Sequence, residues 1–146
     1  MMRARATALV TGATGAVGSV VARRLRLKGY AVRALVRGGR DVEADEVVTG
    51  DLGDHEALGA AARGAEVAVH CAAVVGDDWA ACRRTNVEGT RNLVDALLEE
   101  GCRRLVHMST ISVYDDDVGP TFDETSPLWT EPVNPFLAEL EDSARA

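Results

Sequence analysis

The chain has 146 residues, of which 47% are hydrophobic and 27% charged, a balance typical of a single globular domain. Its formal net charge is −7, which argues against a nucleic-acid or anionic-membrane surface, since both require a basic face. No run approaches the ~20 apolar residues of a membrane span, and no signal peptide precedes the first apolar segment, so we expect a cytoplasmic protein.

Short apolar segments alternate with segments of helical periodicity along the first three quarters of the chain. Strands are predicted at 6–11, 30–36, 46–49, 66–71 and 104–108, and helices at 15–28, 54–63 and 79–100. This alternation predicts βαβ units and hence an α/β fold with a doubly wound parallel sheet of the Rossmann type. If the first strand–helix turn lies at the switch point, the strand order is 3-2-1-4-5.

The chain changes character after residue 112. Residues 114–135 hold all four prolines and an acidic run at 115–117, without a clear period, and predict a loop. Residues 139–146 could form a short helix or a frayed tail. We therefore divide the chain into a dinucleotide-binding domain at 1–114 and a loop with a degenerate tail at 115–146.

The segment TGATGAVG at 11–18 joins the first strand to the first helix. Gly12 permits the tight turn, Gly15 lets a pyrophosphate approach the backbone, and Gly18 lets the helix pack closely. Free amides and the positive end of the helix dipole then face the phosphates. The residues expected to hold the nucleotide here are Gly12, Thr14, Gly15, Ala16 and Val17.

The end of the second strand bears on the choice between NAD and NADP. An acid at this position would bond the ribose 2′-hydroxyl, but the chain has Arg37, whose guanidinium suits a 2′-phosphate. We expect NADP, with NAD as the alternative. Three alternatives remain open: Arg37 is a plain solvated arginine, Arg33 is a second phosphate ligand, or Asp41 binds the ribose.

Other segments yield no metal or hydrolase signature. Cys71, Cys82 and Cys102 are widely spaced and lack the Cys or His partners of a metal site, so reduced thiols and no metal are predicted. No Gly-Lys-Ser/Thr sequence follows the glycines, which makes a P-loop nucleotide hydrolase a poor interpretation. His70 and His107 lie within predicted strands and are expected to be core histidines.

Five motifs occur in order along the chain: TGATGAVG at 11–18, DL at 51–52, HCAA at 70–73, NVEGTRNL at 86–93 and STISVY at 109–114. Together they resemble the extended short-chain dehydrogenases/reductases, the NAD-dependent epimerase/dehydratase family. The resemblance implies cofactor contacts from Asp51, Leu52, Ala72, Ala73 and Asn86, and for Asn86 a buried amide that ties its helix to the sheet stays an open alternative. It also implies that Thr110 is the catalytic Ser/Thr.

The chain departs from that family where the Tyr-x-x-x-Lys pair should stand. Phe136 occupies the tyrosine position and Leu140 the lysine position, so the proton donor and the charge that tunes it are absent. The chain is also shorter than the resemblance implies and lacks the C-terminal substrate part. It is either a truncated or frame-shifted remnant, or a short protein that binds a cofactor without catalysis.

Two functions follow from these patterns. The first is an oxidoreductase or epimerase/dehydratase by descent, impaired as written, acting on an unidentified small molecule. The second is a non-catalytic NADP-binding or redox-sensing module. A homodimer through the helix at 79–100 is possible for either.

Overall fold

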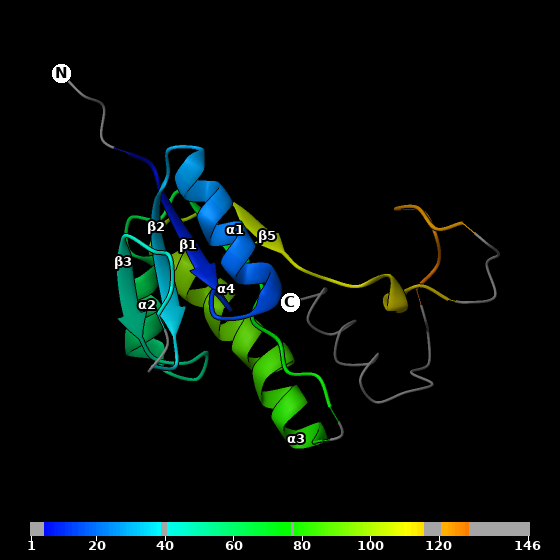
Figure 1. Cartoon of the computed structure of the whole chain (residues 1–146). Helices are drawn as coiled ribbons and strands as arrows, with labels where there is room; N and C mark the ends of the chain where they lie inside the picture. The colour runs from blue at the N-terminus through cyan, green and yellow to red at the C-terminus, as the bar shows by residue number, and fades with distance from the viewer. Residues whose placement is uncertain (1–4, 39–40, 77, 116–120, 129–146) are drawn as a thin grey trace.

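The computed structural model describes residues 5–38, 41–76, 78–115 and 121–128 (Figure 1). Its centre is a five-stranded parallel sheet in the order β3-β2-β1-β4-β5, which confirms the predicted topology. The strands are β1 (Thr7–Thr11), β2 (Ala31–Val36), β3 (Glu46–Thr49), β4 (Val67–His70) and β5 (Leu105–His107). Thr11 pairs with Leu35 on one side and His70 on the other, so these strands end at one edge.

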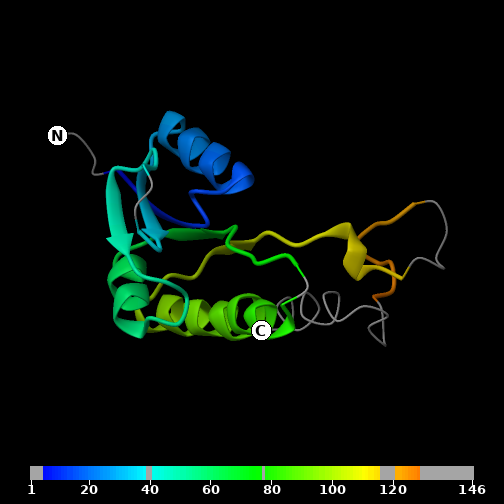
Figure 2. The same cartoon turned by 60° about the horizontal axis from the view of Figure 1, so that its bottom comes forward.

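Helices cover both faces of the sheet, as Figure 2 shows. Helix α1 (Ala16–Leu27) lies on one face, and α2 (His55–Ala62) and α4 (Gly89–Glu99) lie on the other. Neighbouring residues of β1 therefore enter different cores: Leu9 packs with Leu58 and Leu93, while Val10 packs in a cluster with Ala22, Val32, Ala34 and Val36. Strands buried on both faces account for the unbroken apolar runs in the sequence.

The helix predicted at 79–100 is interrupted. It consists of α3 (Trp79–Cys82), the π-helical turn η1 (Arg83–Glu88) and α4. The Gly89 amide bonds the Arg84 carbonyl five residues back, the hydrogen bond of a π-helix. The prediction was wrong here because apolar spacing reports the buried face, and not whether each backbone bond spans four or five residues.

The described residues after β5 include short regular structure at and just before the predicted loop. The 3₁₀ turn η2 (Ile111–Val113) is followed by an antiparallel bridge between Tyr114 and Leu128. The rings of Tyr114 and Phe122 stack with their centroids 5.7 Å apart. Phe136 and Leu140 lie outside the described residues, and no described helix is long and apolar enough to cross a membrane.

Candidate nucleotide-binding site

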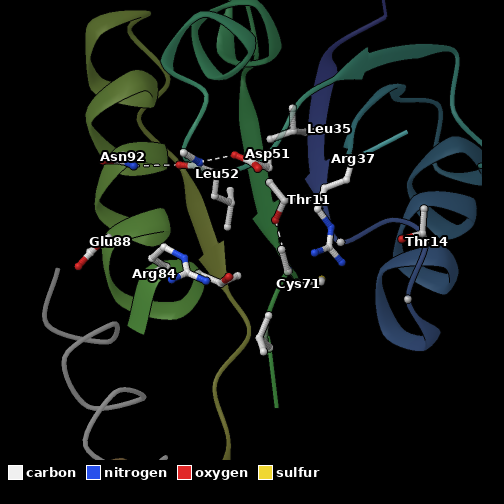
Figure 3. Close-up of a pocket in the computed structure, with 17 residues that line it drawn as sticks. Thr11, Thr14, Leu35, Arg37, Asp51, Leu52, Cys71, Arg84, Glu88 and Asn92 are labelled. Atoms are coloured by element: carbon white, nitrogen blue, oxygen red, sulfur yellow. Dashed lines mark hydrogen bonds between the residues drawn. The ribbon is translucent and has the colours of Figure 1, made fainter. Parts of the chain in front are cut away.

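A cavity of about 530 Å³ opens at the carboxyl ends of β1, β2 and β4 (Figure 3). Crevices at this edge of a doubly wound sheet are where such folds bind ligands. Its walls come from the glycine turn, the ends of β2 and β3, the segment after β4, and η1 with α4. The lining residues are Thr11, Gly12, Thr14, Gly15, Leu35, Arg37, Asp51, Leu52, Gly53, Cys71, Ala72, Ala73, Val74, Arg84, Thr85, Glu88 and Asn92.

The glycine turn tolerates no side chain at two of its three glycines. Gly12 has φ +69°, and a Cβ there would lie 2.6 Å from the backbone nitrogen of Ala72. A Cβ on Gly18 would lie 2.2 Å from the Gly12 carbonyl oxygen. A Cβ on Gly15 would meet the Gly12 oxygen at 3.3 Å and otherwise have space. Gly12 and Gly18 thus shape the turn, while Gly15 keeps the cavity side of the backbone bare.

Helix α1 begins at this turn, and no described side chain caps its first amides. Its N-cap is Gly15, in extended conformation, and neither a side-chain cap nor a first-turn acid is present among the described residues. Ala16 and Val17 follow as exposed residues. The helix therefore presents uncompensated amides and the positive end of its dipole, a combination that favours an anion.

Two arginines in and directly after β2, Arg33 and Arg37, have different surroundings. Arg37 lies at the strand end, and its guanidinium points toward Thr14 and the cavity (Figure 3). Arg33 instead pairs with Glu46 at 2.7 Å and donates to the carbonyls of Ala61 and Arg63 at the end of α2. The alternative of Arg33 as a phosphate ligand is therefore wrong, because its donors hold α2 against the sheet.

The wall formed by Asp51 and Leu52 is held in place by α4. A Cβ on Gly89 would lie 2.7 Å from the Leu52 side chain, so glycine allows this close approach. Asn92 donates to the Leu52 carbonyl at 2.9 Å. Asp51 accepts the Gly53 amide at 2.7 Å and shapes the turn. This wall offers a buried apolar side chain, Leu52, beside a carboxylate.

The segment after β4 is fastened to η1. The Asn86 side chain is 3% exposed, and its amide group both accepts from the Val74 nitrogen and donates to the Val74 oxygen, each at 2.9 Å. The Cys82 thiol lies 3.6 Å from the same carbonyl. Burial raises the pKa of the Cys71 thiol, so this lining residue is a neutral thiol at neutral pH.

His70 lies under the floor of the cavity at 1% exposure, which confirms the predicted core histidine. Its Nδ1 lies 2.6 Å from the Thr11 hydroxyl and its Nε2 lies 3.0 Å from the Thr90 hydroxyl. Burial and the neighbouring His107 ring lower the pKa of His70 to about 4. The imidazole is neutral at pH 7.

Most residues predicted to bind the nucleotide line the cavity: Gly12, Thr14, Gly15, Arg37, Asp51, Leu52, Ala72 and Ala73. Ala16 and Val17 are exposed at the start of α1 and are not among the lining residues, and Asn86 supports the wall from behind. Thr110 lies beyond β5, outside the cavity lining, where its hydroxyl accepts the Ser112 amide at 3.3 Å.

The sequence analysis assigned no role to four polar residues of the cavity wall: Arg84, Thr85, Glu88 and Asn92. Three of them, Arg84, Glu88 and Asn92, line the cavity at intervals of four residues along η1 and α4. A polar stripe with this spacing was the available signal.

The comparisons with known proteins agree with this geometry. The model of the NAD dependent epimerase/dehydratase family matches residues 8–139. The chain is 39% identical to 3-diazoavenalumate denitrifying reductase of Streptomyces sp over 91% of its own length and 49% of that protein. It is 35% identical to cinnamoyl-CoA reductase 1 of Petunia hybrida over 84% of its length and 41% of that protein.

A solved structure gives the same result. A short-chain dehydrogenase/reductase superfamily protein from Agrobacterium tumefaciens, with bound NAD, superposes with a TM-score of 0.82 at 33% identity. The match covers 95% of this chain and 43% of that one, so the chain spans about half the length of the proteins it resembles. On the match over residues 8–139, the chain belongs to the NAD-dependent epimerase/dehydratase family.

Proposed function

We propose that this chain binds NADP in the cavity at the carboxyl edge of the sheet. The observation that carries the proposal is the uncapped start of α1 behind a turn whose Gly12 and Gly18 leave no room for a Cβ. That arrangement fits a diphosphate, which needs backbone amides at close range. The cavity volume of about 530 Å³ lies within the range of ~300–1,000 Å³ of small-molecule sites.

Each wall has a part in holding the cofactor. Gly15, Ala16 and Val17 present backbone amides to the diphosphate. Asp51 and Leu52 border the adenine half, and Ala72 and Ala73 are small enough for the cofactor to lie against their backbone. The nicotinamide, once bound, supplies the site for a hydride.

Arg37 sets the preference for NADP over NAD. It faces the cavity at the end of β2, where a ribose 2′-phosphate would gain a charge-assisted bond that a 2′-hydroxyl cannot match. A hydrogen bond to a charged group contributes about 1.5–3 kcal/mol, so NADPH should bind about tenfold to a hundredfold tighter than NADH.

The test is a fluorescence titration of both reduced nucleotides. Arg37→Asp should remove the NADPH preference and favour NADH, because a carboxylate repels the 2′-phosphate and accepts a bond from the 2′-hydroxyl. Arg103→Asp is the matched control, since Arg103 is exposed next to the opposite end of β5 and makes the same charge change. Equal affinities of the wild type for both nucleotides would contradict the role of Arg37, and no affinity for either would contradict the proposal.

The chain as written is proposed to bind without turnover. The family reaction moves a hydride to or from a carbinol carbon while a tyrosine hydroxyl moves the proton. Phe136 has no such proton, and Leu140 has no charge. The Thr110 hydroxyl could orient a substrate oxygen, but it does not replace the missing proton donor. Oxidation of NADPH by a panel of ketones and sugar nucleotides should stay at the protein-free rate. A robust rate would show that the chain is an oxidoreductase in its own right.

The second candidate function is a redox-sensing module that responds to the bound nucleotide. The absent Tyr and Lys favour it, because binding then has no catalytic consequence. Displacement of bound NADPH by NADP⁺ tests it, because a sensor must bind the reduced and oxidised nucleotides with different affinities, and equal affinities would contradict this function.

A further inference from the structure

A chain of hydrogen bonds crosses the fold beneath the cavity. It starts at the Ala72 amide, which lies 3.3 Å from the Thr11 hydroxyl oxygen. It passes from Thr11 to His70 at 2.6 Å, and from His70 to Thr90 at 3.0 Å. It ends at the Asn86 carbonyl, 2.6 Å from the Thr90 hydroxyl. Strands β1 and β4, η1 and α4 all contribute a member.

Counting protons along this chain assigns every donor. A carbonyl only accepts, so the single proton of the Thr90 hydroxyl goes to Asn86. Nε2 of His70 must then donate to Thr90, which leaves Nδ1 of the neutral ring as an acceptor. The Thr11 hydroxyl donates to that Nδ1 and accepts the Ala72 amide. Only one assignment of the protons therefore gives every hydrogen bond in this chain a donor and an acceptor.

The two ends of the chain belong to different walls of the cavity. Thr11 is the first residue of the glycine turn and lines the cavity itself. At the other end, Asn86 holds both polar backbone atoms of Val74 through its side chain. Thr90 lies between them, 2% exposed, and does not line the cavity.

We propose that His70 is a positioning residue that sets the separation between the glycine turn and residues 71–74, and thereby the affinity for the nucleotide. Its neutral ring joins Thr11 to Thr90 and so couples the phosphate wall to the wall held by Asn86. The inference rests on the proposed nucleotide site. It adds that a hydroxyl outside the cavity, that of Thr90, controls binding through the imidazole.

The test is a double-mutant cycle on NADPH affinity in the full chain. Thr90→Val keeps the shape of the side chain and removes both hydrogen bonds of the Thr90 hydroxyl, to His70 and to the Asn86 carbonyl. The one to His70 is a neutral hydrogen bond worth about fivefold in affinity. His70→Asn keeps an acceptor near Thr11 but is too short to reach Thr90, so it breaks the chain at the same point. If His70 carries the coupling, Thr90→Val weakens binding about fivefold in the wild type and has no further effect in His70→Asn. Equal, additive effects in both backgrounds would overturn the inference.

Two further measurements separate positioning from a general loss of stability. Thr90→Ser retains the hydroxyl and should restore wild-type affinity, whereas a loss of affinity there would attribute the effect to packing. Hydrogen exchange in the nucleotide-free chain should be faster at the Ala72 and Val74 amides in Thr90→Val, and unchanged in the strand pairs of β2 and β3. Unchanged exchange at both amides would overturn the coupling. If the wild type binds no nucleotide but Thr90→Val still shows faster exchange at these two amides, the proposed function is refuted and the coupling remains supported.

Discussion

Gly18→Ala should destabilise the fold, although alanine is the better helix former. Gly18 lies in the first turn of α1, where a Cβ would stand 2.2 Å from the Gly12 oxygen and 2.6 Å from the Gly12 carbonyl carbon. Real Cβ atoms essentially never come closer than 3.0 Å, so the helix start must retreat by most of an ångström from a backbone that cannot bend away.

The matched control is Gly59→Ala in α2. A Cβ at Gly59 meets nothing within 4 Å, so only the helix preference changes, and the free energy of unfolding should rise by about 0.5–1 kcal/mol. At Gly18 the same gain is outweighed by overpacking, which costs about 1–3 kcal/mol. The two variants should therefore shift stability in opposite directions.

Urea unfolding followed by circular dichroism measures both variants. NADPH titration adds the functional comparison, because a shifted α1 start misplaces the amides that hold the diphosphate. Gly18→Ala should weaken binding at least tenfold, a loss of about 1.4 kcal/mol, and Gly59→Ala should leave it unchanged. A stabilised Gly18→Ala variant with wild-type affinity would refute the argument that this glycine is required by close packing.

Two predictions concern other parts of the molecule. Burial lowers the pKa of His70 from 6.5 to about 4. The imidazole is therefore protonated below about pH 6.5 in the unfolded chain, but only below about pH 4 in the folded chain. The contribution of the neutral imidazole to stability is complete above pH 6.5 and is lost as the pH falls from 6.5 to about 4. From pH 7 to pH 5, the free energy of unfolding should therefore drop by about 2 kcal/mol more in the wild type than in His70→Asn. Parallel pH profiles of the two proteins in urea unfolding would contradict this. In β5, Leu105 is 36% exposed and Val106 49% exposed, which is unusual for a parallel strand. Val106→Lys should reduce concentration-dependent self-association in sedimentation velocity, and an unchanged profile would show that this strand does not drive association.

The order of elements and the glycine turn could be predicted because their signals are local. Apolar runs, glycine positions and helix stops are written in consecutive residues, and right-handed crossovers leave few ways to arrange five parallel strands. The five-strand order, the core position of His70 and the cavity placement of Arg37 all followed from such signals.

The sequence left two roles for Asn86 open, a cofactor contact and a buried amide that ties its helix to the sheet. The structure supports a role close to the second, because the side-chain amide makes two hydrogen bonds to the backbone of Val74, twelve residues away. The π-helical turn was also not predicted, because apolar spacing over six residues does not specify which carbonyl each backbone amide bonds. Arg33 in β2 and Arg37 just after it are four residues apart, and only their spatial neighbours show that Arg33 anchors a helix while Arg37 lines the cavity.

By itself, the sequence determined a doubly wound parallel fold with a nucleotide-type turn at its first crossover, because periodicity and glycine placement act between near neighbours. Only the tertiary structure decided which polar side chains face the cavity and which are consumed by the fold. The reason is that Thr11, His70, Asn86 and Thr90 satisfy one another across four elements, and a buried hydrogen bond leaves no trace in the spacing of the residues that make it.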